Sequence, residues 1–182
     1  MLGRLKLLLV LVAILLLAPS AADGDGGMMV YGGDWGLLLS EPAGWHGDTE
    51  DVAKKYRVSV VFLLQAAESR KADVTIRVQV GKKTDENIAG DLSADMDGYK
   101  KEYPKVEFSE LSDIDSRYPF VAKLFFVRGE FYEYVVYLNP GKEYPHILSV
   151  ALSKAKEAAT PSEMAAYQKV IQSLIFTRRK AA

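Results

Sequence analysis

Three strand-like segments follow one another in residues 120–152, which read FVAKLFFVRGEFYEYVVYLNPGKEYPHILSVAL. Apolar side chains recur at every second position, the period of a β-strand, so we expect strands over 120–128, 131–138 and 144–152. The links at 128–130 and 139–142 are too short for a parallel crossover, which predicts an antiparallel meander. Both faces of the first segment are largely apolar, so we place it at the centre of the sheet.

Strand patterns also precede this meander. Apolar residues alternate over 56–65 and 74–80, and shorter apolar segments lie at 37–39 and 106–111. Residues 41–51 are polar and rich in turn formers, so we expect a loop there. Together the segments predict an α+β protein with an antiparallel sheet of about six to seven strands.

Two helices are expected to flank the sheet. The first follows Lys83 and ends at Pro104, because its apolar residues share one helical face: Ile88, Leu92, Met96, Tyr99 and Tyr103. The second begins at Thr160-Pro161-Ser162-Glu163, a capping box with proline at the first helical position. Its apolar stripe contains Met164, Tyr167, Ile171 and Leu174. Stripes of this kind are typical of faces buried against a sheet.

The N-terminus carries the pattern of a secretory signal. Arg4 and Lys6 precede an unbroken apolar run over 7–18, and small residues follow at 20–22. The run is shorter than the roughly 20 residues that a membrane-spanning helix needs. We therefore expect a Sec-type signal peptide over 1–22, a periplasmic or secreted protein, and no permanent membrane anchor after cleavage.

The remaining chain divides into three parts. Residues 23–34 are rich in Gly and Asp and predict a flexible leader. Residues 35–176 predict a single domain, and residues 177–182 a basic tail.

Composition excludes several classes of function. The 182 residues include no cysteine, which excludes thiol catalysis, cysteine-ligated zinc and iron–sulfur clusters. The formal net charge is −1, from 23 basic and 24 acidic side chains, and no local basic stripe is present. We therefore expect no nucleic-acid partner.

The order of the segments and several short motifs resemble the PsbP-like family, which has the Mog/PsbP fold. The motifs are GLLLSEPAGW at 36–45, YKKEYP at 99–104, the aromatic strands after Pro119, SVALS at 149–153 and SLIF at 173–176. The resemblance covers residues 35–176 and includes no catalytic motif. It implies an α/β/α sandwich and a bacterial, exported, non-catalytic accessory protein that docks onto a partner protein or assembly.

No recognisable catalytic motif occurs in the chain, so we expect no enzyme. His146 shares the apolar side of its strand with Leu148, which predicts a buried, hydrogen-bonded histidine. Four carboxylates could supply the acid and base of a hydrolase, the least favoured alternative, although a solvated acidic surface is the better interpretation. These are Glu107, Glu110, Asp113 and Asp115.

The loop at 45–51 offers one candidate metal site. It places an imidazole and carboxylates close together in the chain, at His46, Asp48, Glu50 and Asp51. These are ligand types that zinc and other transition metals accept, so a metal or small-ligand carrier is the alternative function. Asp48 followed by acidic residues equally predicts the cap and first turn of a short helix. No cofactor is expected apart from the divalent metal of this alternative.

An exposed aromatic patch is the candidate surface for a protein partner. Trp45, Tyr132 and Tyr137 are our candidate contacts, because Tyr and Trp are enriched at such interfaces. The identity of the partner does not follow from the sequence.

Overall fold

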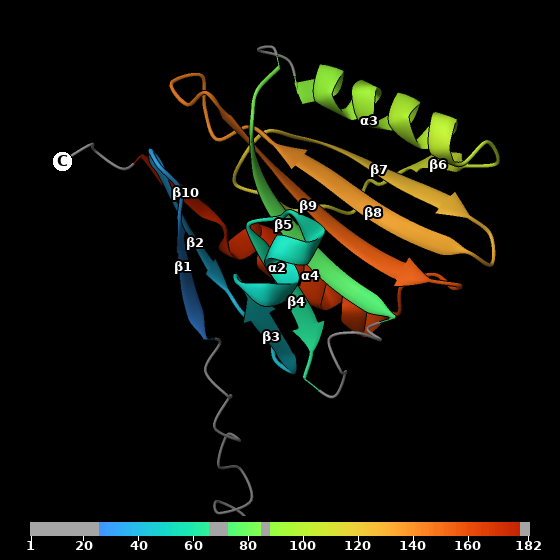
Figure 1. Cartoon of the computed structure of the whole chain (residues 1–182), viewed down its shortest axis with the longest axis horizontal. Coiled ribbons are helices and arrows are strands. Elements are labelled where there is room, and N and C mark those ends of the chain that lie inside the picture. The colour runs from blue at the N-terminus through green and yellow to red at the C-terminus, as the bar shows by residue number, and fades with distance from the viewer. Residues whose placement is uncertain (1–25, 66–72, 85–87, 179–182) are drawn as a thin grey trace, which may run out of the picture.

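The computed structural model describes residues 26–65, 73–84 and 88–178 (Figure 1). The strands in these ranges are β1 Gly27–Tyr31, β2 Trp35–Ser40, β3 Trp45–Asp48, β4 Val60–Leu64, β5 Val74–Lys82, β6 Glu107–Glu110, β7 Phe120–Val127, β8 Phe131–Leu138, β9 His146–Ala155 and β10 Ile175–Arg178. The helices are α2 Asp51–Tyr56, α3 Ile88–Glu102 and α4 Pro161–Ser173. The signal peptide expected over 1–22 lies outside the described ranges. Within them, no helix has the length and apolar character needed to cross a membrane.

Seven strands form one antiparallel sheet in the order β3-β4-β5-β9-β8-β7-β6. The meander predicted from residues 120–152 is present as β7, β8 and β9. Gly129 and Gly141, in the two links, have positive φ values of 79° and 140°, which glycine tolerates best. The predicted α+β fold, with an antiparallel sheet flanked by helices, is confirmed.

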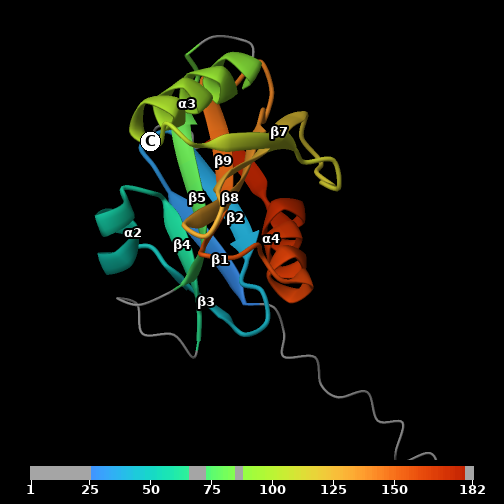
Figure 2. The ribbon, with the colours of Figure 1, turned by 90° about the vertical axis from the view of Figure 1, so that its right-hand side faces the viewer.

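A second, three-stranded sheet and α4 cover one face of the large sheet (Figures 1 and 2). Its order is β1-β2-β10, with β2 in the middle. Leu37 and Phe176 from the small sheet and Tyr167 from α4 enter the main hydrophobic core, where all three are buried. The Tyr167 hydroxyl lies 2.9 Å from the Tyr134 carbonyl oxygen and 3.0 Å from that of Val150, and so ties α4 to β8 and β9.

Among the described residues, helices cover the opposite face of the large sheet at its two ends. Helix α3 packs on β7 and β8, where Leu92 contacts Phe125 and Val135. Helix α2 packs on β4, where Ala53 contacts Val61 and Leu63. Figure 2 shows the two helices apart on this face. The middle of the sheet, β5 and β9, therefore lies between them.

The structure corrects the predicted extent of the leader, the loop and the tail. Strand β1 lies inside the predicted leader, β3 inside the predicted loop at 41–51, and β10 spans the start of the predicted tail. Both β1 and β10 are ordered by pairing with β2, and Met28 and Val30 of β1 pack on the core. In β3, a Cβ on Gly47 would lie 2.3 Å from the Met28 methyl and 3.0 Å from Phe62, so glycine permits this close packing.

Two further expectations about strands were wrong. Strand β7 is next to the edge strand β6, and β9 occupies the middle of the sheet. The apolar residues on both faces of β7 instead reflect the cover by α3, which leaves Phe125 fully buried. The strand expected over 56–65 begins at Val60, because Tyr56 ends α2 and Arg57 takes a left-handed conformation with φ of 55°.

The predicted start of α4 is confirmed in detail. The Thr160 hydroxyl accepts a hydrogen bond from the Glu163 amide at 3.3 Å. The Glu163 carboxylate accepts one from the Thr160 amide at 2.6 Å, which completes the capping box. The stripe residues Tyr167 and Ile171 are fully buried.

Candidate functional site

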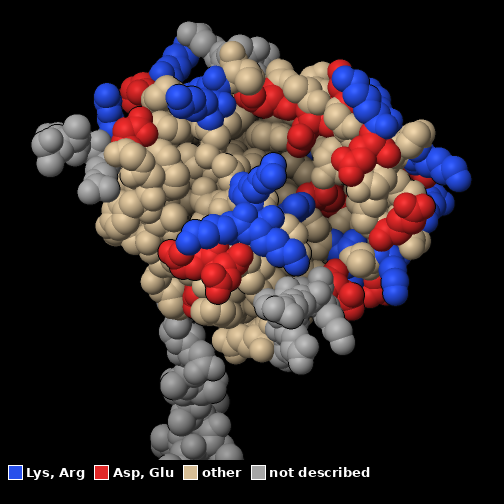
Figure 3. All heavy atoms as spheres, in the orientation of Figure 1, with Lys and Arg blue, Asp and Glu red and all other residues tan. Residues whose placement is uncertain are grey.

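A pocket of about 430 Å³ lies on the large sheet between α2 and α3. Its floor comes from β5, β8 and β9, one wall from α3 and the start of β8, and the other wall from Tyr56 at the end of α2. Figure 3 shows this face of the molecule, with basic side chains gathered around α2 next to a patch of acidic ones, and both signs of charge over α3. The partial helical cover of this sheet face therefore creates the pocket.

Strand register assembles the floor. Ser153 in the central strand lies opposite Thr75 on one side and Glu133 on the other. Arg77 follows Thr75 by two residues, so its side chain leaves the same face of the sheet. Three strands thus bring these side chains together.

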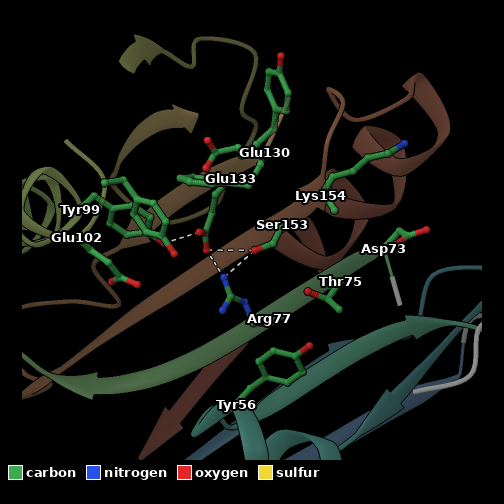
Figure 4. A pocket seen from close by; sticks show the side chains of 14 residues that line it. Tyr56, Asp73, Thr75, Arg77, Tyr99, Glu102, Glu130, Glu133, Ser153 and Lys154 are labelled. Carbon is green, nitrogen blue, oxygen red and sulfur yellow. Dashed lines mark hydrogen bonds and ion pairs between the residues drawn. The ribbon is translucent and has the colours of Figure 1, made fainter. Parts of the chain in front are cut away.

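Four side chains of the pocket form one hydrogen-bonded group, which we call the floor quartet: Arg77, Tyr99, Glu133 and Ser153. One Glu133 oxygen, Oε1, accepts from Arg77 Nη2 and from Ser153 Oγ, the latter at 3.1 Å. The other, Oε2, accepts from the Tyr99 hydroxyl. Arg77 Nη2 also donates to Ser153 Oγ at 2.6 Å. Figure 4 shows the three donors converging on Glu133.

The charged side chains of the quartet are largely buried. The side chains of Glu133 and Arg77 are 10% and 24% exposed, so their ion pair is only weakly screened by solvent. Burial, followed by the charge of Glu133, raises the pKa of the Tyr99 phenol. Tyr99 therefore stays protonated at ordinary pH and acts as a hydrogen-bond donor.

The quartet suits the binding of a polar group better than proton transfer. Ser153 and Glu133 resemble a nucleophile and base, but the carboxylate already accepts three hydrogen bonds and carries an ion pair. These contacts hold both carboxylate oxygens in place as acceptors. By contrast, Arg77 Nε is buried and has no hydrogen-bond partner in the described parts of the chain, so the guanidinium retains unused donor capacity.

Aromatic rings surround the quartet. Tyr99, Tyr103 and Phe131 form a contiguous group, with centroids 4.8 Å apart for Tyr103 and Phe131 and about 6 Å apart for the other two pairs. On the opposite side, the Arg77 guanidinium carbon lies 5.8 Å from the centre of the Tyr56 ring. The pocket therefore combines apolar ring faces with a polar floor, as ligand sites commonly do.

The structure supports the helix-cap interpretation of the loop at 45–51. One oxygen of Asp48 accepts hydrogen bonds at 3.0 Å from the amides of Glu50, Val52 and Ala53, at the start of α2. Glu50 pairs with Lys54.

The predicted metal ligands are not brought together. His46 is exposed and lies 3.8 Å from Glu41. His46, Asp48, Glu50 and Asp51 all fall within the described residues, where no group of three or more His, Asp or Glu side chains is arranged to hold a metal ion. The predicted metal site is therefore not formed. His46 lies at the surface of β3, Asp48 binds the amides at the start of α2, and Glu50 pairs with Lys54.

The predicted aromatic patch is also wrong. Trp45 is 4% exposed and belongs to the main core. Tyr132 is half-buried, lines the pocket and stacks on Phe126, with ring centroids 5.7 Å apart. Tyr137 lies beneath α3 on the other sheet face, where its hydroxyl donates to Asp95 at 2.6 Å. Packing on the two faces of the sheet therefore buries Trp45 and leaves Tyr132 and Tyr137 half-buried, so the three residues do not form one exposed patch.

The acidic surface is exposed and His146 is buried, as predicted. The predicted acidic surface is exposed, and none of its members lines the pocket: Glu107, Glu110, Asp113 and Asp115. His146 is buried, with Nε2 3.4 Å from an oxygen of Asp34.

The floor quartet was not predicted from the sequence. A weak signal exists, since Arg77 and Glu133 are charges of opposite sign within two strongly apolar strands. Their proximity depends on strand order, because they are 56 residues apart in the chain.

Comparison with protein-family models gives no match, and comparison with curated proteins gives none either.

Proposed function

We propose that this chain is an exported, non-catalytic binding protein whose ligand occupies the pocket between α2 and α3. The observation that carries the proposal is the floor quartet, a charged and hydrogen-bonded group already formed at the bottom of an open pocket. Groups fixed before binding lose little entropy when a ligand arrives.

The ion pair itself supports a role beyond stability. A buried ion pair contributes little net stability compared with apolar residues of similar size. Apolar residues occupy three neighbouring positions on this sheet face, at Phe125, Val135 and Ala151. Binding of a polar ligand group explains why a charged pair, and not two apolar residues, occupies these positions.

A non-catalytic role agrees with the hydrogen bonding of Glu133 and with the resemblance to the PsbP-like family. Members of that family are known mostly as accessory proteins of larger assemblies, so the resemblance implies binding rather than turnover.

Ligand screening by NMR tests the proposal. Amide and methyl spectra of the purified protein are recorded with a library of cationic, anionic and neutral small molecules. We expect shifts confined to the pocket lining. Replacing Ala155 in the lining with Trp fills the pocket and should abolish them, whereas Ala158→Trp, at an exposed position outside it, should not. Shifts that survive Ala155→Trp, or no shifts with any library member, would contradict the proposal.

Docking of a protein partner along β1 is a second candidate. Strand β1 is at the edge of the small sheet, and its Met29 and Tyr31 side chains are 50% and 60% exposed. An exposed edge with apolar side chains can add a strand from another protein.

Affinity capture from native extract tests the second candidate. A specific partner should be lost with Met29→Lys plus Tyr31→Lys and kept with Ile175→Lys, a similarly exposed apolar residue on the opposite edge strand. Retention of the partner with Met29→Lys plus Tyr31→Lys would place the interface elsewhere.

Export is tested by cell fractionation and mass spectrometry of the N-terminus. We expect the mature protein to begin at Asp23 and to leave the cytoplasm. An intact N-terminus in the cytoplasmic fraction would contradict this part of the proposal.

A further inference from the structure

The pocket lining carries more acidic than basic side chains. Its carboxylates are Asp73, Glu102, Glu130 and Glu133, and its bases are Arg77 and Lys154. Arg77 is paired with Glu133. Lys154 is directed away from the quartet (Figure 4) and pairs with Glu157 and Glu163 at 3.1 and 2.9 Å. Neither base therefore neutralises the other carboxylates of the lining.

Two of those carboxylates stand beside the aromatic group. Glu102 ends α3, directly before Tyr103, and Glu130 directly precedes Phe131. Both are exposed at the mouth of the pocket. Figure 4 shows them on the same side as Tyr99, whereas Asp73 points away. We call the five side chains on this side the α3 wall: Tyr99, Glu102, Tyr103, Glu130 and Phe131.

The negative charge converges on the rings. The pKa of the Tyr103 phenol is raised by its hydrogen bond to Glu102, then by burial, and further by the charges of Glu102, Glu133 and Glu130. Aromatic faces attract cations through the ring quadrupole, and nearby carboxylates add a direct Coulomb attraction.

We propose that the α3 wall binds an organic cation, with an alkylammonium group between the two carboxylates and its carbons against the rings. This inference rests on the proposed function, since it names the ligand class of the same pocket. An anion would be repelled by Glu102 and Glu130, while the charge of Arg77 is already balanced by Glu133. A bare metal ion would need a cluster of ligands that the described residues do not provide. The pocket volume of about 430 Å³ suits an organic molecule.

The experiment compares choline with 3,3-dimethylbutan-1-ol, a neutral molecule of the same shape. Both are titrated into the purified protein, and binding is followed by NMR shifts of the pocket residues. We expect choline to bind at least about fivefold more tightly, because only the charged molecule gains from the rings and carboxylates.

Substitutions in the α3 wall test whether these side chains are responsible for the preference for choline. Glu102→Gln with Glu130→Gln should weaken choline binding by about fivefold or more and leave the alcohol unchanged. The matched control, Glu110→Gln with Glu143→Gln, removes two exposed carboxylates outside the lining and should leave choline affinity within about twofold, as expected for distant screened charges. Tyr103→Leu should weaken choline more than the alcohol, because leucine keeps apolar contact but has no aromatic face.

The outcomes separate this inference from the function on which it rests. Equal affinity for choline and the alcohol, or pocket shifts with neutral or anionic library members and none with choline, would overturn the organic cation and leave the binding pocket standing. Absence of pocket shifts with every library member would overturn both. Choline binding that survives loss of both wall carboxylates would also refute the proposed placement of the cation.

Discussion

Replacing Glu133 with glutamine tests whether the floor quartet is energetically one unit. The substitution keeps the shape of the side chain and removes its charge. Arg77 then loses its ion-pair partner, and the stronger, charge-assisted hydrogen bonds become neutral ones.

The expected loss follows from the exposure of the two partners. Removing one member of a fully buried ion pair costs about 3–5 kcal/mol. Arg77 is 24% exposed and can recover part of its hydration, and glutamine still accepts hydrogen bonds. We therefore expect a loss of about 2–3 kcal/mol, or a fall in Tm on the order of 4–12 °C for a chain of this size.

Urea unfolding of a double-mutant cycle measures the coupling. Glu133→Gln, Arg77→Met and the double variant should give a coupling energy of about 1.5 kcal/mol or more, since the double variant leaves no unpaired charge. The exposed pair Lys54–Glu50, with both side chains 71% exposed, is the reference, with an expected coupling below about 1 kcal/mol. If the Arg77–Glu133 coupling is no larger than that of the reference pair, the quartet is not a coupled unit.

Three further measurements test the surrounding structure. Asp48→Ala should lower the free energy of unfolding in urea by about 1 kcal/mol, because the amides at the start of α2 lose their acceptor. Asp51→Ala is the control and should cost less. Equal losses would contradict the role of Asp48 as a cap. Tyr167→Phe should cost about 1–2 kcal/mol because two buried carbonyls lose their shared donor, and an unchanged urea midpoint would contradict this. Burial acts to raise the pKa of Glu163, but hydrogen bonds, above all from Lys154, lower it below the ordinary value of 4.5. Between the lowered pKa and 4.5 the unfolded chain therefore binds more protons than the folded protein. The contribution of Glu163 to the free energy of unfolding is therefore present above about pH 4.5 and lost as the pH falls through the lowered pKa. The stability of Glu163→Gln should accordingly fall less in acid than that of the unchanged protein. Identical profiles of stability against pH would contradict the ion pair.

The success of sequence-based prediction depended on how local the signal was. The start of α4 is specified within four residues, 160–163, and was predicted in detail. The meander was predicted because its links are short and its alternation is regular. By contrast, β1 and β10 are short and each is stabilised by pairing with β2, so their own sequences gave little sign of strand structure.

Candidate contact residues failed for a related reason. Trp45 and Tyr137 were predicted to be exposed from residue type alone, whereas exposure depends on which layer covers each face of the sheet. His46 and Asp48 are neighbours in sequence, but the strand leaves His46 at the surface while Asp48 turns to the amides of α2.

Local patterns in the chain were sufficient to predict an antiparallel α+β fold, because alternation, turn chemistry and helix caps act over a few residues. The pocket was decided by tertiary structure alone. Arg77 meets Glu133 across 56 residues and Ser153 across 76, and both contacts require β9 to lie between β5 and β8. The separation of α2 from α3 leaves that part of the sheet open, and no short segment encodes the distance between two helices that pack on different strands.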